Sequence, residues 1–163
     1  MSVLVEITFK LSHKFSAADL KNTKFDLLVR SPEMRISGSD MVWRIHVYPY
    51  GGRSFTGKEH RDKVGVFVCN RGKEGVTASY YKLFALPYCS DDEKTLLRSS
   101  ENMKFEPHGV TRGVFTDQLD QGAASATNDG CLVIEVPRSL IVRDCLLQAV
   151  YLPLESSQLS FRF

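Results

Sequence analysis

The sequence lacks any apolar run of the length that a membrane-spanning helix needs, which is about 18 residues. It also lacks a Cys-x-x-Cys pair, and its four histidines are scattered, so no group of residues has the spacing of a zinc site. The net charge is only +2, which gives no basic surface of the kind that binds nucleic acid or membranes. We therefore expect no metal and no cofactor, and neither nucleic acid nor membrane as a partner.

The short motifs that mark common catalytic sites are missing as well. The chain contains no Gly-x-Gly-x-x-Gly fingerprint, no phosphate-binding loop, no Gly-x-Ser-x-Gly and no His-Glu-x-x-His. Cys89 and His108 supply a thiol and an imidazole, the residue types of a catalytic pair, but nothing in the sequence indicates that they are adjacent. The sequence therefore predicts a protein that is not an enzyme.

The cysteine pattern indicates a reducing compartment. Cys69, Cys131 and Cys145 lie in apolar, strand-like runs, and only Cys89 lies outside one. Small buried thiols explain this pattern and predict a cytoplasmic or nuclear protein, with a disulfide framework as the alternative. Residues 1–11 have neither the basic start nor the cleavage site of a signal peptide, and they alternate in hydrophobicity as a strand does.

The composition is that of one folded domain. Of 163 residues, 43% are hydrophobic and 25% are charged, which is enough apolar material for a core without disulfide staples. Short apolar runs are separated by turn residues, and no long amphipathic helix pattern is present. The expected strands are residues 3–11, 25–29, 42–48, 64–69, 76–88, 102–106 and 130–136. This pattern predicts an all-β fold, an antiparallel β-sandwich of seven to eight strands.

Other segments give local signals. Ser16 is placed to cap a short helical turn. Residues 90–101 are polar and predict either a wide hairpin loop or one helical turn. Pro137 is expected to interrupt the last clean strand, because proline cannot donate a ladder hydrogen bond. We accordingly expect a sandwich over residues 1–137 and a C-terminal extension, residues 138–163, that packs on the sandwich or mediates contacts.

Residues 31–52, SPEMRISGSDMVWRIHVYPYGG, form the most informative stretch. Residues 42–48 are dense in β-branched and aromatic side chains, and Pro49 ends the run. If Ile45 and Val47 face the core, alternation puts Arg44, His46 and Tyr48 together on the outward row. That row is interpreted either as a polar patch in a binding groove or as a solvated sheet face.

The order of residues in this stretch resembles that of the MATH domain, the β-sandwich shared by TRAF adaptors, meprins and ubiquitin-pathway proteins. The resemblance begins with Ser-Pro, a short strand and Trp-Arg-Ile-x-Val-Tyr-Pro-x-Gly, and it covers roughly residues 3–136 in the family's order. The strands of residues 64–68 and 81–86 and the closing Asn-Asp-Gly-Cys-Leu-Val-Ile-Glu-Val of residues 128–136 are similar to family strands. Where the family usually has Trp-Gly-Phe, this chain has His108-Gly109-Val110, which leaves the peptide motif open.

The resemblance implies a peptide-binding groove on a sheet surface. In that reading, Phe67 and Tyr81 form the apolar floor, with core packing as the alternative, and His46 meets a polar group of the ligand. Two imidazoles in such a site predict pH sensitivity near their ordinary pKa of ~6.5. The groove residues that the resemblance implies are His46, Phe67, Tyr81, Phe105, His108, Gly109 and Val110.

The function expected from these observations is that of a non-catalytic adaptor. It would bind an extended peptide of a partner protein, in a ubiquitin-pathway or signalling complex. One alternative is a structural or oligomerising subunit that uses residues 138–163, which makes a homo-oligomer a possible partner. Another is the substrate-recognition part of a ubiquitin ligase or deubiquitinase.

Overall fold

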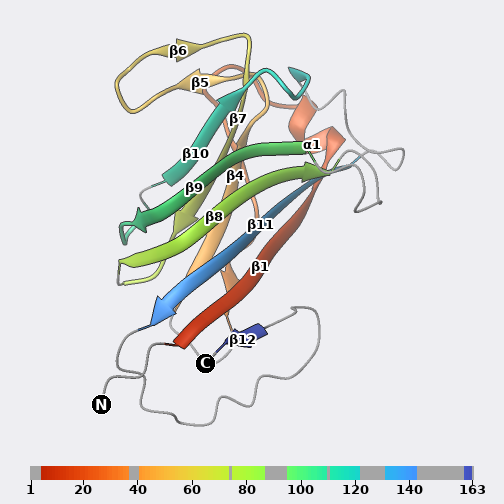
Figure 1. Ribbon diagram of the computed structural model, residues 1–163. Coiled ribbons are helices and arrows are strands. Elements are labelled where there is room, and N and C mark those ends of the chain that lie inside the picture. The colour runs from red at the N-terminus through yellow and green to blue at the C-terminus, as the bar shows by residue number, and fades with distance from the viewer. Residues whose placement is uncertain are drawn as a thin grey trace.

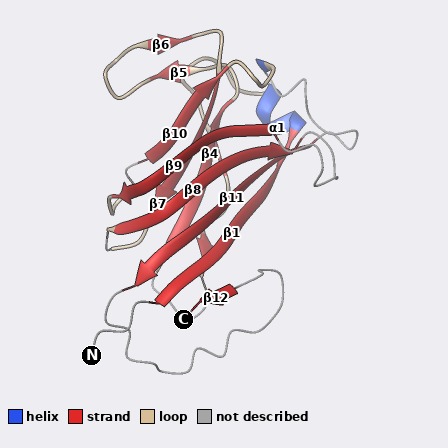
Figure 2. Ribbon diagram, in the orientation of Figure 1, coloured by secondary structure: helices blue, strands red, loops and turns tan. Residues whose placement is uncertain are grey.

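Two antiparallel sheets dominate the computed structural model of the chain (Figures 1 and 2). The structure describes residues 5–36, 41–73, 75–86, 95–109, 111–121, 131–142 and 160–162. Sheet A has the strand order β12-β1-β11-β8-β9, and sheet B has the order β10-β7-β4-β2, with β3 also paired to β4. Sheet A comprises β1 (Val5–Ser16), β8 (Val76–Leu86), β9 (Thr95–Phe105), β11 (Cys131–Val142) and β12 (Ser160–Arg162). Sheet B comprises β2 (Val29–Arg30), β3 (Met34–Arg35), β4 (Val42–Tyr48), β7 (Val64–Asn70) and β10 (Thr111–Thr116).

Two smaller elements complete the described part. The hairpin of β5 (Gly52–Arg53) and β6 (Glu59–His60) projects beyond the upper end of the sandwich in Figure 1. Helix α1 (Ala17–Lys21) follows β1 and begins after Ser16, as the sequence predicts, although the Ser16 side chain makes no capping hydrogen bond. No helix among the described residues is long and apolar enough to span a membrane.

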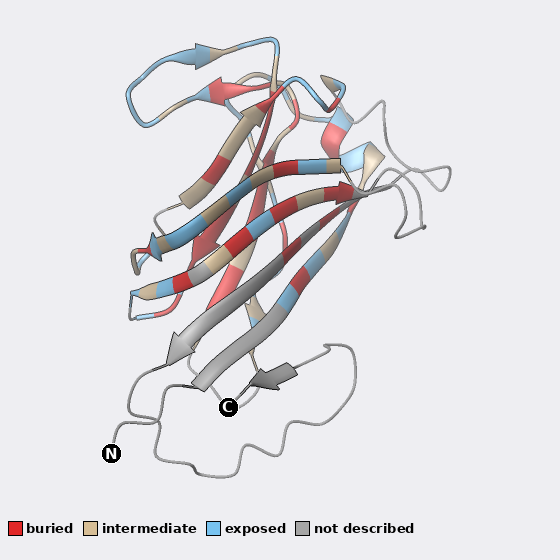
Figure 3. Cartoon of the chain, in the orientation of Figure 1, coloured by how far each residue is buried: buried red, intermediate tan, exposed pale blue. Residues whose placement is uncertain are grey.

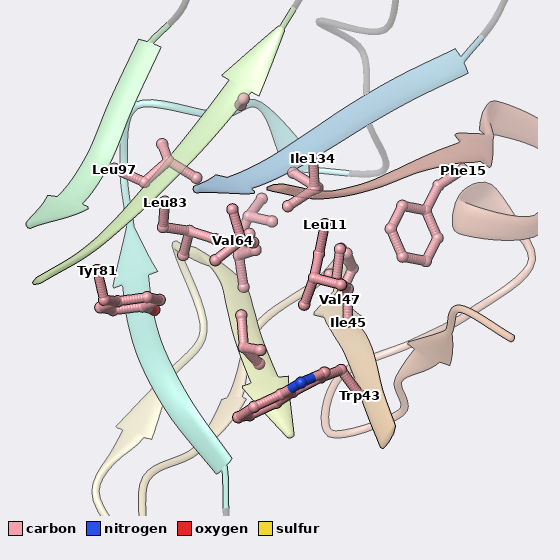
Figure 4. Close-up of a cluster of buried hydrophobic side chains, with 14 of the residues drawn as sticks. Leu11, Phe15, Trp43, Ile45, Val47, Val64, Tyr81, Leu83, Leu97 and Ile134 are labelled. Carbon is pink, nitrogen blue, oxygen red and sulfur yellow. The ribbon is translucent and has the colours of Figure 1, made fainter. Parts of the chain in front are cut away.

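The core lies between the two sheets, which confirms the predicted sandwich (Figures 3 and 4). Trp43 on β4 is fully buried, and its ring meets Phe105 of β9 edge-on at a centroid distance of 5.4 Å. Phe105 in turn meets Tyr81 of β8 edge-on at 5.5 Å. Aromatic pairs favour this geometry, so the three rings join both sheets at one end of the core.

The last long strand continues through Pro137, which corrects the expectation that this proline interrupts it. β11 pairs with β1 along its whole length, with Pro137 opposite Lys10. On its other side β11 pairs with β8, where Glu135 lies opposite Phe84 and Arg138 lies opposite Tyr81. Within the described part of the chain, Val136 and Pro137, between these two pairs, have no paired residue on β8. The strand therefore stays continuous, because β1 pairs with it at Pro137 and β8 pairs with it before and after the proline. The domain boundary expected at 137 falls inside this strand.

The polar stretch from 90 to 101 also differs from its prediction. Residues 87–94 lie outside the described part, but residues from Thr95 onward belong to β9, which pairs with β8 along its length. Only Leu97 and Phe105 of this strand are buried, and the other side chains are exposed or half-buried. Because β9 is an edge strand with few core positions, residues 95–101 look like a loop or helical turn in sequence, and only residues 102–106 are predicted to be extended.

Candidate functional site

The side of sheet B that faces away from the core carries arginine, histidine, cysteine and aromatic side chains close together. Trp43, Ile45 and Val47 of β4 point into the core, so Arg44 and His46 lie on the opposite side, as does Tyr48. We call this side the outer face of sheet B; its residues are Arg30, Arg44, His46, Tyr48, Phe67, Cys69 and Phe115, with Gly65 and Gly113 between them.

The strand register arranges the outer face in rows. In the middle row, Arg30 of β2 lies opposite His46, which lies opposite Phe67 of β7. In the row on one side, Tyr48 lies opposite Gly65, and Gly65 lies opposite Phe115 of β10. The row on the other side places Arg44 opposite Cys69. Basic residues therefore gather toward one end of the strands and aromatic residues toward the other.

The aromatic end is a contiguous cluster, which we call the aromatic patch: Tyr48, His60, Phe67 and Phe115. Phe67 packs edge-on against Tyr48 at 5.8 Å and against Phe115 at 5.1 Å between ring centroids. His60 from the β5–β6 hairpin stacks on Phe115 at 4.4 Å with nearly parallel rings. All four side chains are only half-buried, so the patch leaves aromatic surface open to solvent.

Two glycines let these rings lie on the sheet. A Cβ atom at Gly65 would come within 2.7 Å of the Phe115 ring, and one at Gly113 would lie 2.0 Å from the carbonyl oxygen of Val66. Both separations are far below van der Waals contact. The absence of side chains at these two positions therefore makes room for the patch.

The basic end holds three guanidinium groups, which we call the arginine cluster: Arg30, Arg44 and Arg71. Among the described residues, Glu33 is the carboxylate that pairs with them; it lies 3.8 Å from Arg44 and 3.9 Å from Arg71. It also lies 3.7 Å from Arg35, which is 72% exposed. Arg30 makes no ion pair among the described residues. One carboxylate therefore faces an excess of positive charge.

Two buried polar residues hold this cluster in place. Ser31 donates its N–H to the carbonyl of Ile45 at 2.8 Å and accepts the Ile45 N–H on its Oγ at 2.9 Å, which fixes the segment of Arg30 against β4. Asn70 ends β7, and its side chain accepts the N–H of Gly72 at 2.9 Å. The N–H of Arg71 donates to Val42 at 2.7 Å.

His46 lies between the arginine cluster and the aromatic patch, and it is buried, with 9% of its surface exposed. His46 is on the outward row, as alternation predicts, but its burial corrects the expectation that the imidazole titrates near its ordinary pKa. Burial, together with the nearby charges of Arg30, Arg44 and Arg71, lowers the pKa of His46 to about 4. Its Nε2 atom is buried and has no hydrogen-bond partner among the described residues, and the same holds for Nε of Arg44.

The thiol of Cys69 lies on the same face and is free. Burial raises the pKa of Cys69, and the same three arginines oppose that rise. This result agrees with the predicted buried thiol at this position. Cys89 and Cys145 lie outside the described residues, as does the side chain of Cys131.

The residues predicted for the groove fall into three groups. His46 and Phe67 are neighbours on the outer face, and Gly109 adjoins that face, because a Cβ atom built there would lie 3.1 Å from Nη1 of Arg71 and 3.8 Å from Sγ of Cys69. His108 is exposed beside it, with a positive φ of 62°. Tyr81 and Phe105 instead lie in the core, with no exposed surface. Val110 lies outside the described residues.

Sequence reasoning missed Arg30, Arg71 and Phe115 as members of this face. Alternation along residues 64–70 was the available signal for Phe67 and Cys69. With Val64, Val66 and Val68 facing the core, it predicts that these two side chains face outward. Which residues of β2 and β10 meet that row depends on strand register. Register is a long-range property that a single sequence does not reveal.

Nothing in the described residues suggests a metal centre, since no three His, Cys, Asp or Glu side chains gather there. A scan of protein-family models found no match to this chain, and a search of curated proteins found none either.

Proposed function

We propose that the protein is a non-catalytic adaptor module that binds an extended peptide of a partner protein across the outer face of sheet B. The observation that carries the proposal is the half-exposed aromatic patch placed directly beside the arginine cluster. Aromatic and arginine side chains are enriched where proteins bind one another, and they supply most of the binding free energy at such surfaces. An outer sheet face with no partner would be expected to carry mainly polar side chains.

The order of MATH-like motifs along the chain supports the same proposal. Sheet-based modules bind extended peptides through pockets for alternate side chains, often with an added strand. In this resemblance the partner would belong to a ubiquitin-pathway or signalling complex. The two predicted groove residues that share the outer face, His46 and Phe67, lie at its centre.

Contacts with side chains of the outer face should contribute more to the binding free energy of a peptide than pairing of the peptide as an added strand at β10. This strand ends the order of sheet B, so among the described strands none is paired with its second edge. Arg98 of β9, however, donates a hydrogen bond to the carbonyl of Gly113, and the Tyr81 hydroxyl reaches the carbonyl of Arg112 at 3.4 Å. Two carbonyls of the edge strand are thus already engaged from the direction of sheet A. A ligand would depend mainly on the outer face.

The test is selection from a library of random extended peptides by the purified protein, followed by affinity measurements on the selected sequences. The double variant His46→Ala, Phe67→Ala should lose binding while keeping a cooperative unfolding transition. Lys58→Ala, on the exposed β5–β6 hairpin, is the matched control and should bind as the wild type does. If the folded double variant binds every selected peptide unchanged, the surface lies elsewhere, and residues 138–163 become the next region to test.

A further inference from the structure

We infer that the arginine cluster receives a phosphate group of the bound peptide, so that the ligand is a phosphorylated segment with an apolar side chain two to four residues away. The inference rests on the proposed function, because it names the chemistry of the peptide that the outer face binds. It commits to a phosphate monoester on a protein segment, and a phosphorylated lipid surface becomes an outcome of the test.

The charge balance of the site carries the first step. Arg30, Arg44 and Arg71 bring three positive charges, and Glu33 is the one carboxylate that contacts any of them among the described residues. Counting only the described residues, two positive charges are left without a carboxylate, and a phosphate monoester carries about 1.5 to 2 negative charges at neutral pH. The contacts of Glu33 at 3.8 and 3.9 Å are longer than the roughly 2.7–2.9 Å of a strong charged hydrogen bond. Within the part of the chain that the structure describes, no strong hydrogen bond occupies these guanidinium donors, so they can serve a ligand.

The placement of the three arginines carries the second step. They come from three different segments, since Arg30 belongs to β2, Arg44 to β4, and Arg71 follows β7. Their charges act together on both His46 and Cys69, which lie on adjacent strands of the same face. Guanidinium groups that converge from several sides suit a phosphate, which offers three acceptor oxygens.

His46 supplies the third step, because it is more than nine-tenths buried and its Nε2 has no partner among the described residues. The groups around it are the arginine cluster, Tyr48 on its own strand and Phe67 opposite; on the outer face, the described part of β10 adds no charged side chain. Burial and, to a smaller extent, the charges of the three arginines lower the pKa of His46, and a nearby phosphate would offset the effect of those charges. The imidazole could then take up a proton and donate a hydrogen bond, so binding should be coupled to proton uptake.

The distance between the two ends of the face sets the spacing in the ligand. His46 and Arg44 precede Tyr48 by two and four residues on the same strand. Strands rise roughly 3.3 Å per residue, so these positions lie about 7 and 13 Å from Tyr48. An extended peptide has the same rise. A phosphate at the arginine cluster therefore places an apolar side chain on the aromatic patch when the two residues are two to four positions apart.

The experiment uses nine-residue peptides with a central phosphoserine and one leucine or phenylalanine placed two, three or four positions to either side. Matched peptides carry serine or aspartate at the centre, and affinities are measured by fluorescence anisotropy at pH 7.5 and about 150 mM salt. We expect the phosphoserine form of at least one spacing to bind best. Removing one charged hydrogen-bond donor with Arg30→Gln should weaken it by roughly ten- to a hundredfold and leave the serine form unchanged.

Two further variants separate recognition from folding. Glu33→Gln removes the competing carboxylate and should strengthen phosphopeptide binding, which is opposite in sign to Arg30→Gln. Lys58→Gln removes an exposed positive charge from the β5–β6 hairpin, which adjoins the aromatic end of the face and not the arginine cluster, and should not change the preference for phosphoserine. Arg30 is exposed and makes no ion pair among the described residues, so its replacement should leave the unfolding transition unchanged.

The outcomes are distinguishable from failure of the proposed function. If serine or aspartate peptides bind as tightly as phosphoserine ones, the phosphate inference is overturned while the peptide-binding proposal stands. If no peptide binds but vesicles containing phosphatidylinositol phosphates do, both are overturned. If Arg30→Gln weakens all peptides equally, the arginine cluster does not read the phosphate, which also overturns the inference.

Discussion

His46 on β4 lies directly opposite Phe67 on β7, and this pair joins the two halves of the outer face of sheet B. A buried imidazole with a lowered pKa borders a half-exposed phenyl ring, with positive charge on one side and aromatic surface on the other. Among the described residues, this face combines a buried imidazole whose Nε2 has no hydrogen-bond partner with three arginines that share one carboxylate, and both features are unfavourable for stability without a ligand. The imidazole and the arginine cluster therefore lower the stability of the free protein at the surface that we propose for binding.

Truncation of Trp43 should be among the most destabilising single changes in the protein. Its side chain has no exposed surface and packs edge-on against Phe105 across the core. Trp43→Ala should lower the free energy of unfolding by roughly 3–5 kcal/mol, as large core truncations do. Urea denaturation measures this, with Phe55→Ala as the control, because Phe55 is fully exposed on the β5–β6 hairpin. A loss below about 1 kcal/mol for Trp43→Ala would contradict the core described above.

Because the pKa of His46 is lowered in the folded state, the free energy of unfolding should decrease as the pH is lowered from about 6.5 to about 4. The unfolded imidazole binds its proton near pH 6.5, but the folded one does so only near pH 4. Above pH 6.5 both states are neutral at this site, and between pH 6.5 and 4 the unfolded state gains protons first, so stability decreases as pH falls. At about 1.4 kcal/mol per pH unit the full loss is roughly 3 kcal/mol.

A comparison of wild type with His46→Gln isolates this effect. The difference between their unfolding free energies at pH 7.5 and pH 5 should change by about 2 kcal/mol, with the wild type losing more. A difference that is the same at both pH values would show that His46 keeps an ordinary pKa in the folded protein.

The two glycines of the outer face should differ in their tolerance of alanine. At Gly113 a Cβ atom would meet backbone atoms of Val66 and Phe67, which cannot move without disturbing the ladder. At Gly65 it would meet the ring of Phe115, which can rotate away. Gly113→Ala should therefore cost roughly 1–3 kcal/mol and Gly65→Ala less. Equal costs in urea denaturation, or the reverse order, would contradict the packing of β10 on β7.

Cys69 should react slowly with alkylating reagents while the protein is folded. Burial raises its pKa and covers the sulfur, so little accessible thiolate is present at pH 7.5. Iodoacetamide followed by peptide mapping should modify Cys69 readily in urea and only slowly without it. Equal rates in both conditions would place this thiol at the surface.

The sequence predicted the sandwich well because its strongest signals are local. Alternation around Trp43 and the apolar run 64–69 identify β4 and β7, and both have the expected core rows. Residues 95–101 of β9 resemble a loop or helical turn in sequence, and only residues 102–106 are predicted as a strand, because an edge strand with two buried positions carries almost no periodic signal. Pro137 was read as a stop because its effect depends on which neighbour strand needs the missing donor.

The candidate site was harder to predict than the fold. Motif resemblance brought together His46 and Phe67, which are neighbours, with Tyr81 and Phe105, which face the core from the other sheet. Arg30 and Phe115 come from separate strands whose sequences carry no mark of a shared surface. They join the site through pairing register, which is set by the whole sheet.

The most direct test of the account is an NMR titration of the isotopically labelled protein with the tightest peptide from the phosphoserine set. If the outer face of sheet B is the binding surface, the largest amide shift changes should fall on residues 44–48, 65–71 and 111–115, and they should disappear in the folded double variant His46→Ala, Phe67→Ala. Shift changes concentrated on β1 and β12, with the outer face unaffected, would contradict it.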